Sequence, residues 1–196
     1  MSKNIFYILL GTGGHGKVAF SIARHNKMEI IAVCDPNLTI SNQSHWEGIS
    51  VIPENLVEKS YNNKNIQLIN GVGCNGNTNN RKSLFENFKR KGFKFATLIH
   101  PSAWVDNSSR IMEGAQIMAG AVIQTECKIG SNTIINTNSS IDHDCIIGKN
   151  VHIAPGSTIC GDVTIGNSTF IGAGTIVVNN TKIPKDKYYK AGSIIK

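Results

Sequence analysis

The chain has 196 residues, of which 40% are hydrophobic and 17% charged, and this composition is that of a globular protein rather than a fibrous or disordered one. No stretch approaches the roughly 18 consecutive apolar residues of a membrane span, and the apolar segment near the start is too short for a signal peptide, so we expect no membrane span and a cytoplasmic protein. The net charge of +7 favours an anionic partner, and because the basic residues are scattered without interleaved aromatics we expect a phosphorylated small molecule rather than nucleic acid.

The first half of the chain alternates predicted strands and helices. Residues 4–27 are typical of an apolar strand, a glycine turn and a helix, and residues 29–36 of a second strand. A loop that enters a short strand is expected over 45–56, a third strand over 65–73 and a basic helix over 78–92. This alternation predicts a small α/β domain with a Rossmann-like parallel sheet.

The turn after the first strand has the pattern of a phosphate-binding loop. Residues 11–16, GTGGHG, match G-x-G-x-x-G, and the acidic Asp35 follows 19 residues after Gly16. Glycines let backbone amides at a helix start approach a phosphate, and the acid suits a ribose or sugar hydroxyl. A dinucleotide cofactor, a nucleotide-sugar and a purely structural turn all remain open. Fewer than 100 residues cannot hold both halves of a dinucleotide-binding domain, which favours the nucleotide-sugar. The candidate binding residues of this domain are Gly11, Gly13, Gly14, His15 and Asp35.

The second half of the chain is a hexapeptide repeat. From Ile99 to residue 182 it divides into fourteen hexads without an insertion. The first position is always Ile or Val, and the fifth is always small or β-branched. Neither a helix nor a plain strand has period six, whereas a three-sided coil with one short strand and one corner per hexad does. The repeat therefore predicts a parallel β-helix of about five coils, with glycines such as Gly130 and Gly148 at corners that need positive φ.

Residues 18 apart in this repeat are expected to stack at the inter-strand spacing of about 4.8 Å. Cys127 and Cys145 therefore stack, either as two small core residues or as a redox pair. The five cysteines form no CxxC pair and their number is odd, so reduced thiols are expected. Because such a prism has flat faces and no pocket of its own, we expect ligands to bind between neighbouring copies, and a homotrimer is the natural closure.

His143 is the candidate catalytic base. It lies at the third, outward position of the hexad IDHDCI, between Asp142 and Asp144, and an adjacent carboxylate would orient an imidazole and raise its basicity. A surface histidine with incidental neighbours is the alternative. His152 in the repeat could hydrogen-bond a ligand, and His15 in the glycine turn could meet a phosphate or serve only as a cap.

Metal and covalent chemistry have less support in the sequence. Asp142, His143 and Asp144 are consecutive, and on an extended segment their side chains alternate between faces, so no metal site is expected there. Cys145 occupies an inward core position and is therefore a poor nucleophile. Direct proton abstraction from a substrate amine or hydroxyl is the chemistry that remains.

Several of these segments closely resemble one family over nearly the whole chain. They are GTGGHGK, LIHPSAWV, IINTNSSIDHDC and IGKNVHIAPGSTICGDVTIG. The family is that of the bacterial sugar acetyltransferases, which join a small nucleotide-sugar-binding domain to a left-handed hexapeptide β-helix. Its members include the UDP-4-amino-sugar N-acetyltransferases of the bacillosamine pathway, GDP-perosamine N-acetyltransferases and the sialic-acid O-acetyltransferase type.

The resemblance implies acetyl-CoA as the acetyl donor and a trimer with active sites between subunits. It also implies His143 as the base, Asp144 as the carboxylate that tunes it, and Asn136 as a residue that positions substrate. His152 and Gly161 would contact the thioester end of acetyl-CoA. The glycine turn, His15 and Asp35 would hold the nucleotide-sugar.

We therefore expect a two-domain enzyme. Residues 1–97 would bind the nucleotide-sugar, and residues 98–196 would form the β-helix that binds acetyl-CoA. The enzyme would transfer acetyl directly to the amine of a nucleotide-linked amino-deoxysugar for surface glycan biosynthesis, such as lipopolysaccharide or capsule, without a metal. The alternatives are O-acetylation of a sialic or related sugar and a non-catalytic trimeric scaffold.

Overall fold

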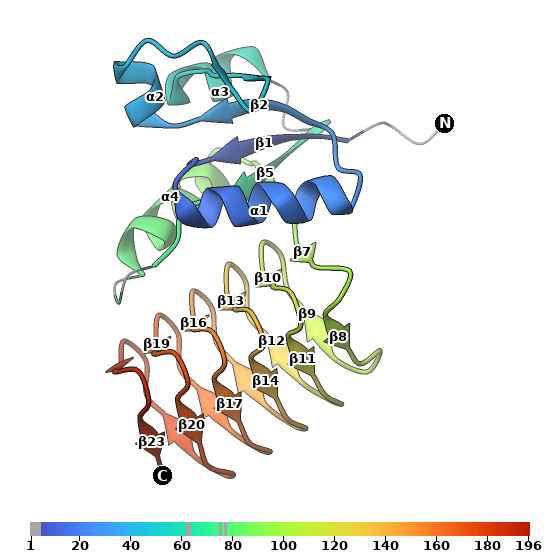
Figure 1. Cartoon of the computed structure of the whole chain (residues 1–196), viewed down its shortest axis with the longest axis vertical. Coiled ribbons are helices and arrows are strands. Elements are labelled where there is room, and N and C mark those ends of the chain that lie inside the picture. Colours follow the sequence, from blue (N-terminus) through green and yellow to red (C-terminus); the bar gives the residue numbers. More distant parts are fainter. Residues whose placement is uncertain (1–4, 62–63, 75, 77) are drawn as a thin grey trace. The chain divides into compact units, whose positions relative to one another are not determined.

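The chain forms two compact units, which consist of residues 1–73 with 83–96 and of residues 74–82 with 97–196 (Figure 1). The computed structural model describes residues 5–61, 64–74, 76 and 78–196, so Asn4, the first residue of the first predicted segment, lies outside the described residues. Helix α4, Asn79–Arg90, contributes its first turn to the second unit and the rest to the first.

The first unit is built on a four-stranded parallel sheet with strand order β2-β1-β5-β6. The three longer strands are buried at their carboxyl ends, as expected for parallel strands covered on both faces. This confirms the predicted parallel sheet. The strands and helices are β1 Phe6–Leu10, α1 Gly14–His25, β2 Ile30–Cys34, α2 Pro36–Ile40, β3 His45–Trp46, β4 Ile49–Ser50, α3 Glu54–Ser60, β5 Ile66–Asn70 and β6 Lys94–Phe95.

Helices α2 and α3 have no counterpart in the sequence analysis, and the segment 45–56, expected as a loop that enters a short strand, contains the two strands β3 and β4 and the start of α3. Helix α2 follows Asp35, which caps its amino end, and helix α3 follows Pro53. Strands β3 and β4 form a two-residue hairpin. These elements are too short to show a clear hydrophobic period, which is why a sequence pattern misses them.

The second unit is the parallel β-helix that the hexads predict. Its two-residue strands form three parallel sheets of six, six and five strands, and each strand pairs with the strand 18 residues later, as Ile117 does with Ile135. The fold is the left-handed hexapeptide β-helix. Its strands are β7 Leu98–Ile99, β8 Trp104–Val105, β9 Arg110–Ile111, β10 Gln116–Ile117, β11 Val122–Ile123, β12 Lys128–Ile129, β13 Ile134–Ile135, β14 Ser140–Ile141, β15 Ile146–Ile147, β16 His152–Ile153, β17 Thr158–Ile159, β18 Thr164–Ile165, β19 Phe170–Ile171, β20 Ile176–Val177, β21 Lys182–Ile183, β22 Tyr188–Tyr189 and β23 Ile194–Ile195.

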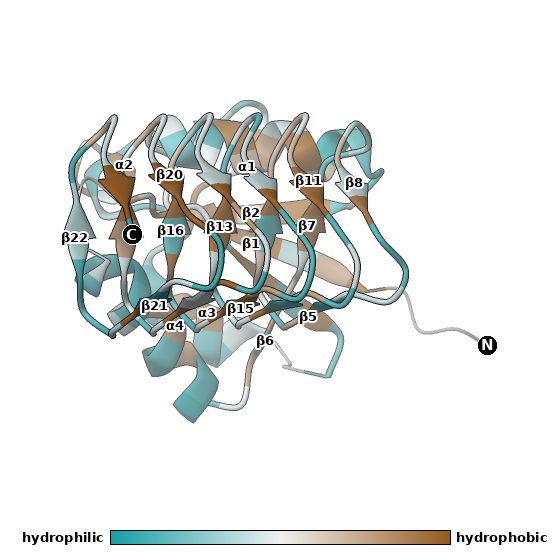
Figure 2. Ribbon diagram, turned by 90° about the horizontal axis from the view of Figure 1, so that it is seen from below, coloured by the Kyte–Doolittle hydropathy of each residue, from teal (hydrophilic) through white to brown (hydrophobic). Residues whose placement is uncertain are grey.

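The core of the β-helix consists of first-position and fifth-position side chains. The first-position residues from Ile117 to Val177 and the fifth-position residues from Ala115 to Thr175 are buried. Figure 2 shows the hydrophobic colour on the strands and the hydrophilic colour at many corners. Each large buried aliphatic side chain contributes about 1.5–3 kcal/mol, so the stack of coils supplies its own core. The strands also continue beyond residue 182, where Ile183 and Ile195 keep the first-position pattern.

The fourth position of the hexad carries the positive φ angle at the corners. From Gly114 to Gly192 every fourth-position residue has φ between +55° and +72°, and most of them are Gly, Asn or Asp. The glycines singled out in the sequence, Gly130 and Gly148, are at the second position instead and have no positive φ. A Cβ on Gly130 would lie 2.5 Å from the carbonyl of Gly148, so these glycines allow neighbouring coils to approach closely.

None of the helices in the described part of the chain has the length and apolar character that crossing a membrane requires.

Candidate active site

His143 lies at the corner between β14 and β15, and its side chain is largely exposed. Asp144 takes the positive φ of that corner, at +61°, so residues 142–144 turn instead of forming the extended segment that the sequence suggested. The reason is that the chain must bend at every corner of the prism, once per hexad. The corner places the Asp144 carboxylate beside the imidazole rather than on the opposite face.

The His143 ring is held in one orientation by its neighbours. Its Nδ1 lies 2.8 Å from Oδ2 of Asp144, and its backbone N–H donates to Oδ1 of Asp142 at 2.9 Å. An acceptor-only carboxylate at Nδ1 assigns the proton to Nδ1 and leaves Nε2 with the lone pair. The hydrogen bond to Asp144, with the charge of Asp142, raises the pKa of His143 above its ordinary value. His143 therefore has the tautomer and the raised basicity of a general base.

Gly161 in the next coil leaves the space that the His143 ring fills. A Cβ at Gly161 would lie 2.6 Å from both Cε1 and Nε2 of His143. The two residues are 18 apart in the chain. The residue after Gly161 links the two coils, since the backbone N–H of Asp162 donates a hydrogen bond to the carbonyl of His143 at 2.9 Å. Any side chain at position 161 would push against the nitrogen that would accept the proton.

Asn136 and His152 form a second polar pair on the β-helix. Nδ2 of Asn136 is 3.2 Å from Nε2 of His152, and Oδ1 of Asn136 accepts from the backbone N–H of Thr137 at 2.8 Å. Because the amide group of Asn136 donates, Nε2 of His152 acts as the acceptor. His152 is only 5% exposed, and its ring packs against Phe170 with centroids 5.1 Å apart. The pair is thus fixed in orientation.

One copy of the β-helix brings some of the predicted residues together and keeps others apart. His143, Asp144 and Gly161 meet at the corner between the sheets of β14 and β15. His152 begins β16, which belongs to the third sheet, and in a three-sided prism that sheet lies opposite this corner. No group of three or more His, Cys, Asp or Glu side chains in the described residues is arranged to hold a metal ion.

The sheet face beside the corner is not flat, contrary to the expectation from the repeat. A groove of about 240 Å³ crosses strands β11, β14 and β17. It is lined by Val122, Gln124, Ser140, Ile141, Asp142, Thr158, Ile159 and Cys160. The small side chains at Ser140 and Thr158 create the hollow between longer neighbours, and the repeat could not show this because outward positions vary. Because Asp142 lines the groove and directly precedes His143 in the chain, the groove lies next to His143.

The buried cysteines of the β-helix are core residues. Sγ of Cys127 lies 3.0 Å from the carbonyl of Asp142, and Sγ of Cys145 lies 3.1 Å from the carbonyl of Cys160. Each thiol therefore donates to the backbone of the next coil. All five cysteines of the chain are free thiols.

In the first unit, four glycines allow the glycine turn to pack closely against neighbouring backbone. Gly11 has φ of +92°, and a Cβ on either Gly16 or Gly71 would lie 2.2 Å from the Gly11 carbonyl oxygen. A Cβ on Gly73 would lie 2.8 Å from Cβ of His15. Gly71 and Gly73 were not among the sequence candidates, although two glycines at the end of a predicted strand are a signal for such close approach.

Gly13 and Gly14 face open space instead. No atom would lie within 4 Å of a Cβ on either residue. Gly13 is the N-cap of the twelve-residue helix α1 and makes no side-chain capping bond. Backbone N–H groups at such a helix start attract anions, so this is the part of the turn that can admit a phosphate.

Asp35 ties the glycine turn to helix α2. Its Oδ2 accepts from both N and Oγ1 of Thr12 at 2.8 Å, and its Oδ1 accepts from N of Asn37 at 2.9 Å. Burial by itself would raise the pKa of Asp35, but these hydrogen bonds outweigh it and the pKa is lowered. Three of roughly four acceptor positions are occupied within the chain, so Asp35 has a structural role that sequence spacing did not reveal.

Two family models match the chain. The PglD N-terminal domain matches residues 7–88, and the bacterial transferase hexapeptide (six repeats) matches residues 126–161. The class of protein is thus a hexapeptide-repeat transferase with a PglD-type domain in front of the β-helix.

Solved structures with the same two-part architecture narrow this class. The acetyltransferase domain of PglB from Neisseria gonorrhoeae is 32% identical, with a TM-score of 0.88 over 98% of this chain and 92% of that chain. Its complex with acetyl coenzyme A is 31% identical, with a TM-score of 0.87 over 98% and 93%. A histidine variant of perosamine N-acetyltransferase from Caulobacter crescentus, in complex with CoA and GDP-perosamine, is 29% identical, with a TM-score of 0.87 over 97% and 88%. The chain belongs to this bacterial sugar acetyltransferase family.

Proposed function

We propose that this protein transfers the acetyl group of acetyl-CoA to the amine of a nucleotide-linked amino-deoxysugar. The observation that carries the proposal is the exposed His143, oriented by Asp144 and seated against Gly161. The complexes of the two related acetyltransferases with acetyl-CoA, or with CoA and GDP-perosamine, support the two ligands. The sugar we propose is a 4-amino-4,6-dideoxyhexose or a 2-acetamido-4-amino-trideoxyhexose, destined for a surface glycan.

In the proposed mechanism the neutral sugar amine attacks the thioester carbonyl carbon directly. A C–N bond forms, the C–S bond breaks, and His143 Nε2 takes the proton that the nitrogen loses and passes it to the departing thiolate. The Asp144 carboxylate stabilises the imidazolium that exists between these two transfers. No covalent acetyl-enzyme is needed, because both substrates bind together and the gain comes from orientation.

The two domains expected from the sequence have separate tasks in this proposal. Residues 1–97 bind the nucleotide-sugar, with the diphosphate at the open Gly13–Gly14 end of α1 and with His15 and Asp35 beside it. Residues 98–196 bind acetyl-CoA, with the groove beside Asp142 adjacent to the base. The net charge of +7 suits two polyphosphate ligands.

We further propose that the active enzyme is a homotrimer. Within one copy, the third sheet, where His152 begins a strand, lies opposite the His143 corner. A threefold neighbour can bring its own His152 and Asn136 towards that corner, where they would contact the thioester end of acetyl-CoA and position the sugar. Both substrates are metabolites of the cytoplasm, which is where we place the reaction.

The test is a screen of acetyl-CoA consumption with the full chain against a panel of UDP-, dTDP- and GDP-linked amino-sugars and free sialic acids. We expect rapid turnover of a nucleotide 4-amino-sugar and a product whose acetyl group survives mild alkali, as an amide does. His143→Ala should lower kcat by roughly 10²–10⁴-fold with little change in acetyl-CoA affinity.

An alkali-labile ester on sialic acid, without activity on nucleotide amino-sugars, would replace this proposal with O-acetyl transfer. Binding of both ligands without turnover of any panel member would favour a non-catalytic scaffold. Near-normal turnover of His143→Ala would remove the histidine from the mechanism.

A further inference from the structure

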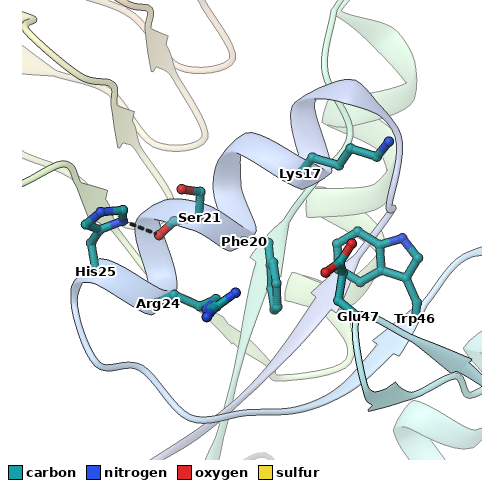
Figure 3. Close-up of a pocket in the computed structure, with 7 residues that line it drawn as sticks. All are labelled: Lys17, Phe20, Ser21, Arg24, His25, Trp46 and Glu47. Atoms are coloured by element: carbon teal, nitrogen blue, oxygen red, sulfur yellow. Dashed lines mark hydrogen bonds between the residues drawn. The ribbon is translucent and has the colours of Figure 1, made fainter.

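A groove of about 570 Å³ runs along the flank of helix α1 in the first unit (Figure 3). It is lined by Lys17, Phe20, Ser21, Arg24, His25, Trp46 and Glu47. The proposed acetyl transfer uses none of these side chains. The volume falls within the range of about 300–1,000 Å³ that is usual for small-molecule sites.

Two aromatic rings form one wall of the groove. The rings of Phe20 and Trp46 meet edge to face, with centroids 4.9 Å apart and an interplanar angle of 67°. Trp46 is placed by the β3–β4 hairpin, whose turn residues Glu47 and Gly48 have φ of +50° and +77°. A tight turn of this kind fixes the hairpin, so the partly exposed indole is a preformed surface for a flat ring.

The charges around this wall are mainly positive. Arg24 lies over the Phe20 ring, with its guanidinium carbon 5.7 Å from the ring centroid, and Lys17 lies seven residues earlier on the same helix. Seven residues are two helical turns, or about 10 Å, so the two cations flank the aromatic wall along the groove. Glu47 is the one carboxylate in the lining. Figure 3 shows Phe20 and Arg24 extending from α1 towards the side where Trp46 and Glu47 lie.

The cationic end of the groove is distinct from the glycine turn. Arg24 lies ten residues after Gly14 on α1, which corresponds to about 15 Å along the helix. Because α1 follows β1 and runs back against the parallel strands, Arg24 is near the amino ends of the strands and Gly14 near their carboxyl ends. A ligand held by Arg24 and Trp46 would therefore not occupy the Gly13–Gly14 helix start.

We propose that this groove is a second ligand site, which binds a nucleoside phosphate. The base would stack on Trp46, the phosphates would pair with Arg24, and Lys17 at the other side of the wall would add positive charge at longer range. The argument rests on the coincidence of a ring-sized aromatic wall, two flanking cations and sufficient volume in residues that the proposed transfer does not use.

The test follows the intrinsic fluorescence of Trp46, because the base would stack on this side chain. Trp46 and Trp104 are the two tryptophans of the chain, so Trp104→Phe in the full-length protein leaves Trp46 alone. Titration with ADP, with the signal corrected for the absorbance of ADP, should give saturable quenching of the Trp46 fluorescence. Arg24→Gln should weaken ADP binding by about tenfold or more, the usual effect of losing one charge-assisted hydrogen bond. The exposed Lys17→Met, which poses no folding risk, should weaken it in the same direction.

Two matched variants make the test specific. Glu47→Gln removes the opposing charge and should strengthen ADP binding, a change of opposite sign from a neighbouring position. Gly14→Ala should leave ADP binding to the groove unchanged even if it abolishes nucleotide-sugar binding. This variant therefore tests the groove and the glycine turn as two independent sites.

Three outcomes would overturn the proposal. The first is the absence of saturable quenching up to about 5 mM ADP, beyond the affinity range of a specific site. The second is binding of inorganic phosphate as tightly as ADP, measured by its competition with ADP. This result would make the groove an anion site without base recognition. The third is loss of quenching in Gly14→Ala, which would assign the ADP signal to the glycine turn.

Discussion

The residue-scale chemistry of this protein depends on a corner of the β-helix. The left-handed conformation of Asp144 turns its carboxylate towards Nδ1 of His143, and the missing side chain of Gly161 leaves room for the imidazole one coil away. Asp144 could not perform its role at another position of the hexad, because the fourth position alone has the positive φ. The orientation of the histidine by its carboxylate therefore depends on the conformation of this turn.

Replacing the carboxylate that orients the base should change the pH dependence of turnover. Because the hydrogen bond to Asp144 raises the pKa of His143, Asp144→Asn should lower that pKa and move the acid limb of kcat/KM to lower pH. The plateau should also fall, roughly tenfold to a thousandfold, because a weaker and less oriented base accepts the proton. The measurement is kcat/KM from pH 5 to 9 with one substrate for both enzymes, so that the titration of the sugar amine is common to both.

Asp162→Asn is the matched control, since it removes the carboxylate at the equivalent corner position of the next coil and leaves the His143–Asp144 bond intact. Its profile should coincide with that of the unchanged protein. An unshifted acid limb in Asp144→Asn would mean that Asp144 does not tune the base.

At the scale of elements, glycines of different function lie side by side in one turn. Gly16 and Gly71 crowd the carbonyl of Gly11, whereas Gly13 and Gly14 border open space. The motif G-x-G-x-x-G thus contains both packing glycines and ligand-facing glycines. The same division occurs in the β-helix, where Gly130 allows close stacking and fourth-position glycines provide the corner conformation.

Two alanine substitutions in the glycine turn should have opposite consequences. Gly16→Ala places a methyl group 2.2 Å from a backbone oxygen and should lower the free energy of unfolding by roughly 1–3 kcal/mol or more. Gly14→Ala meets no atom and adds a helix-favouring residue, so stability should be unchanged or higher by about 0.5–1 kcal/mol, while nucleotide-sugar affinity falls. Urea unfolding and calorimetric titration measure the two effects. Equal destabilisation by both substitutions would contradict the packing described.

At the scale of the whole molecule, the β-helix stacks a core of its own but separates polar residues that the family resemblance groups together. The corner with His143 and the third sheet with His152 lie on opposite sides of one prism. We therefore propose that assembly with neighbouring copies completes the site. Exposed apolar side chains on one sheet, Trp104, Ile176 and Ile194, are further surface that an assembled neighbour could cover.

The proposed trimer has a simple physical signature. Three chains of 21.2 kDa should sediment as a species of about 64 kDa at assay concentration. Mixing an inactive His143→Ala chain with an inactive His152→Ala chain should restore part of the activity, because some sites in mixed trimers then contain both histidines. A fully active monomer would show that one copy is sufficient.

The sequence by itself determined the β-helix, the parallel sheet and the family, because a period of six and the alternation of strands and helices are local patterns with few structural solutions. It also predicted His143 as the base from its outward hexad position, and the family resemblance implied Asp144 as its partner. Other features are decided only by contacts between residues far apart in the chain, which no local pattern encodes. The tertiary structure alone showed that Asp35 is used by Thr12 and Asn37, and that Gly71 crowds the glycine turn.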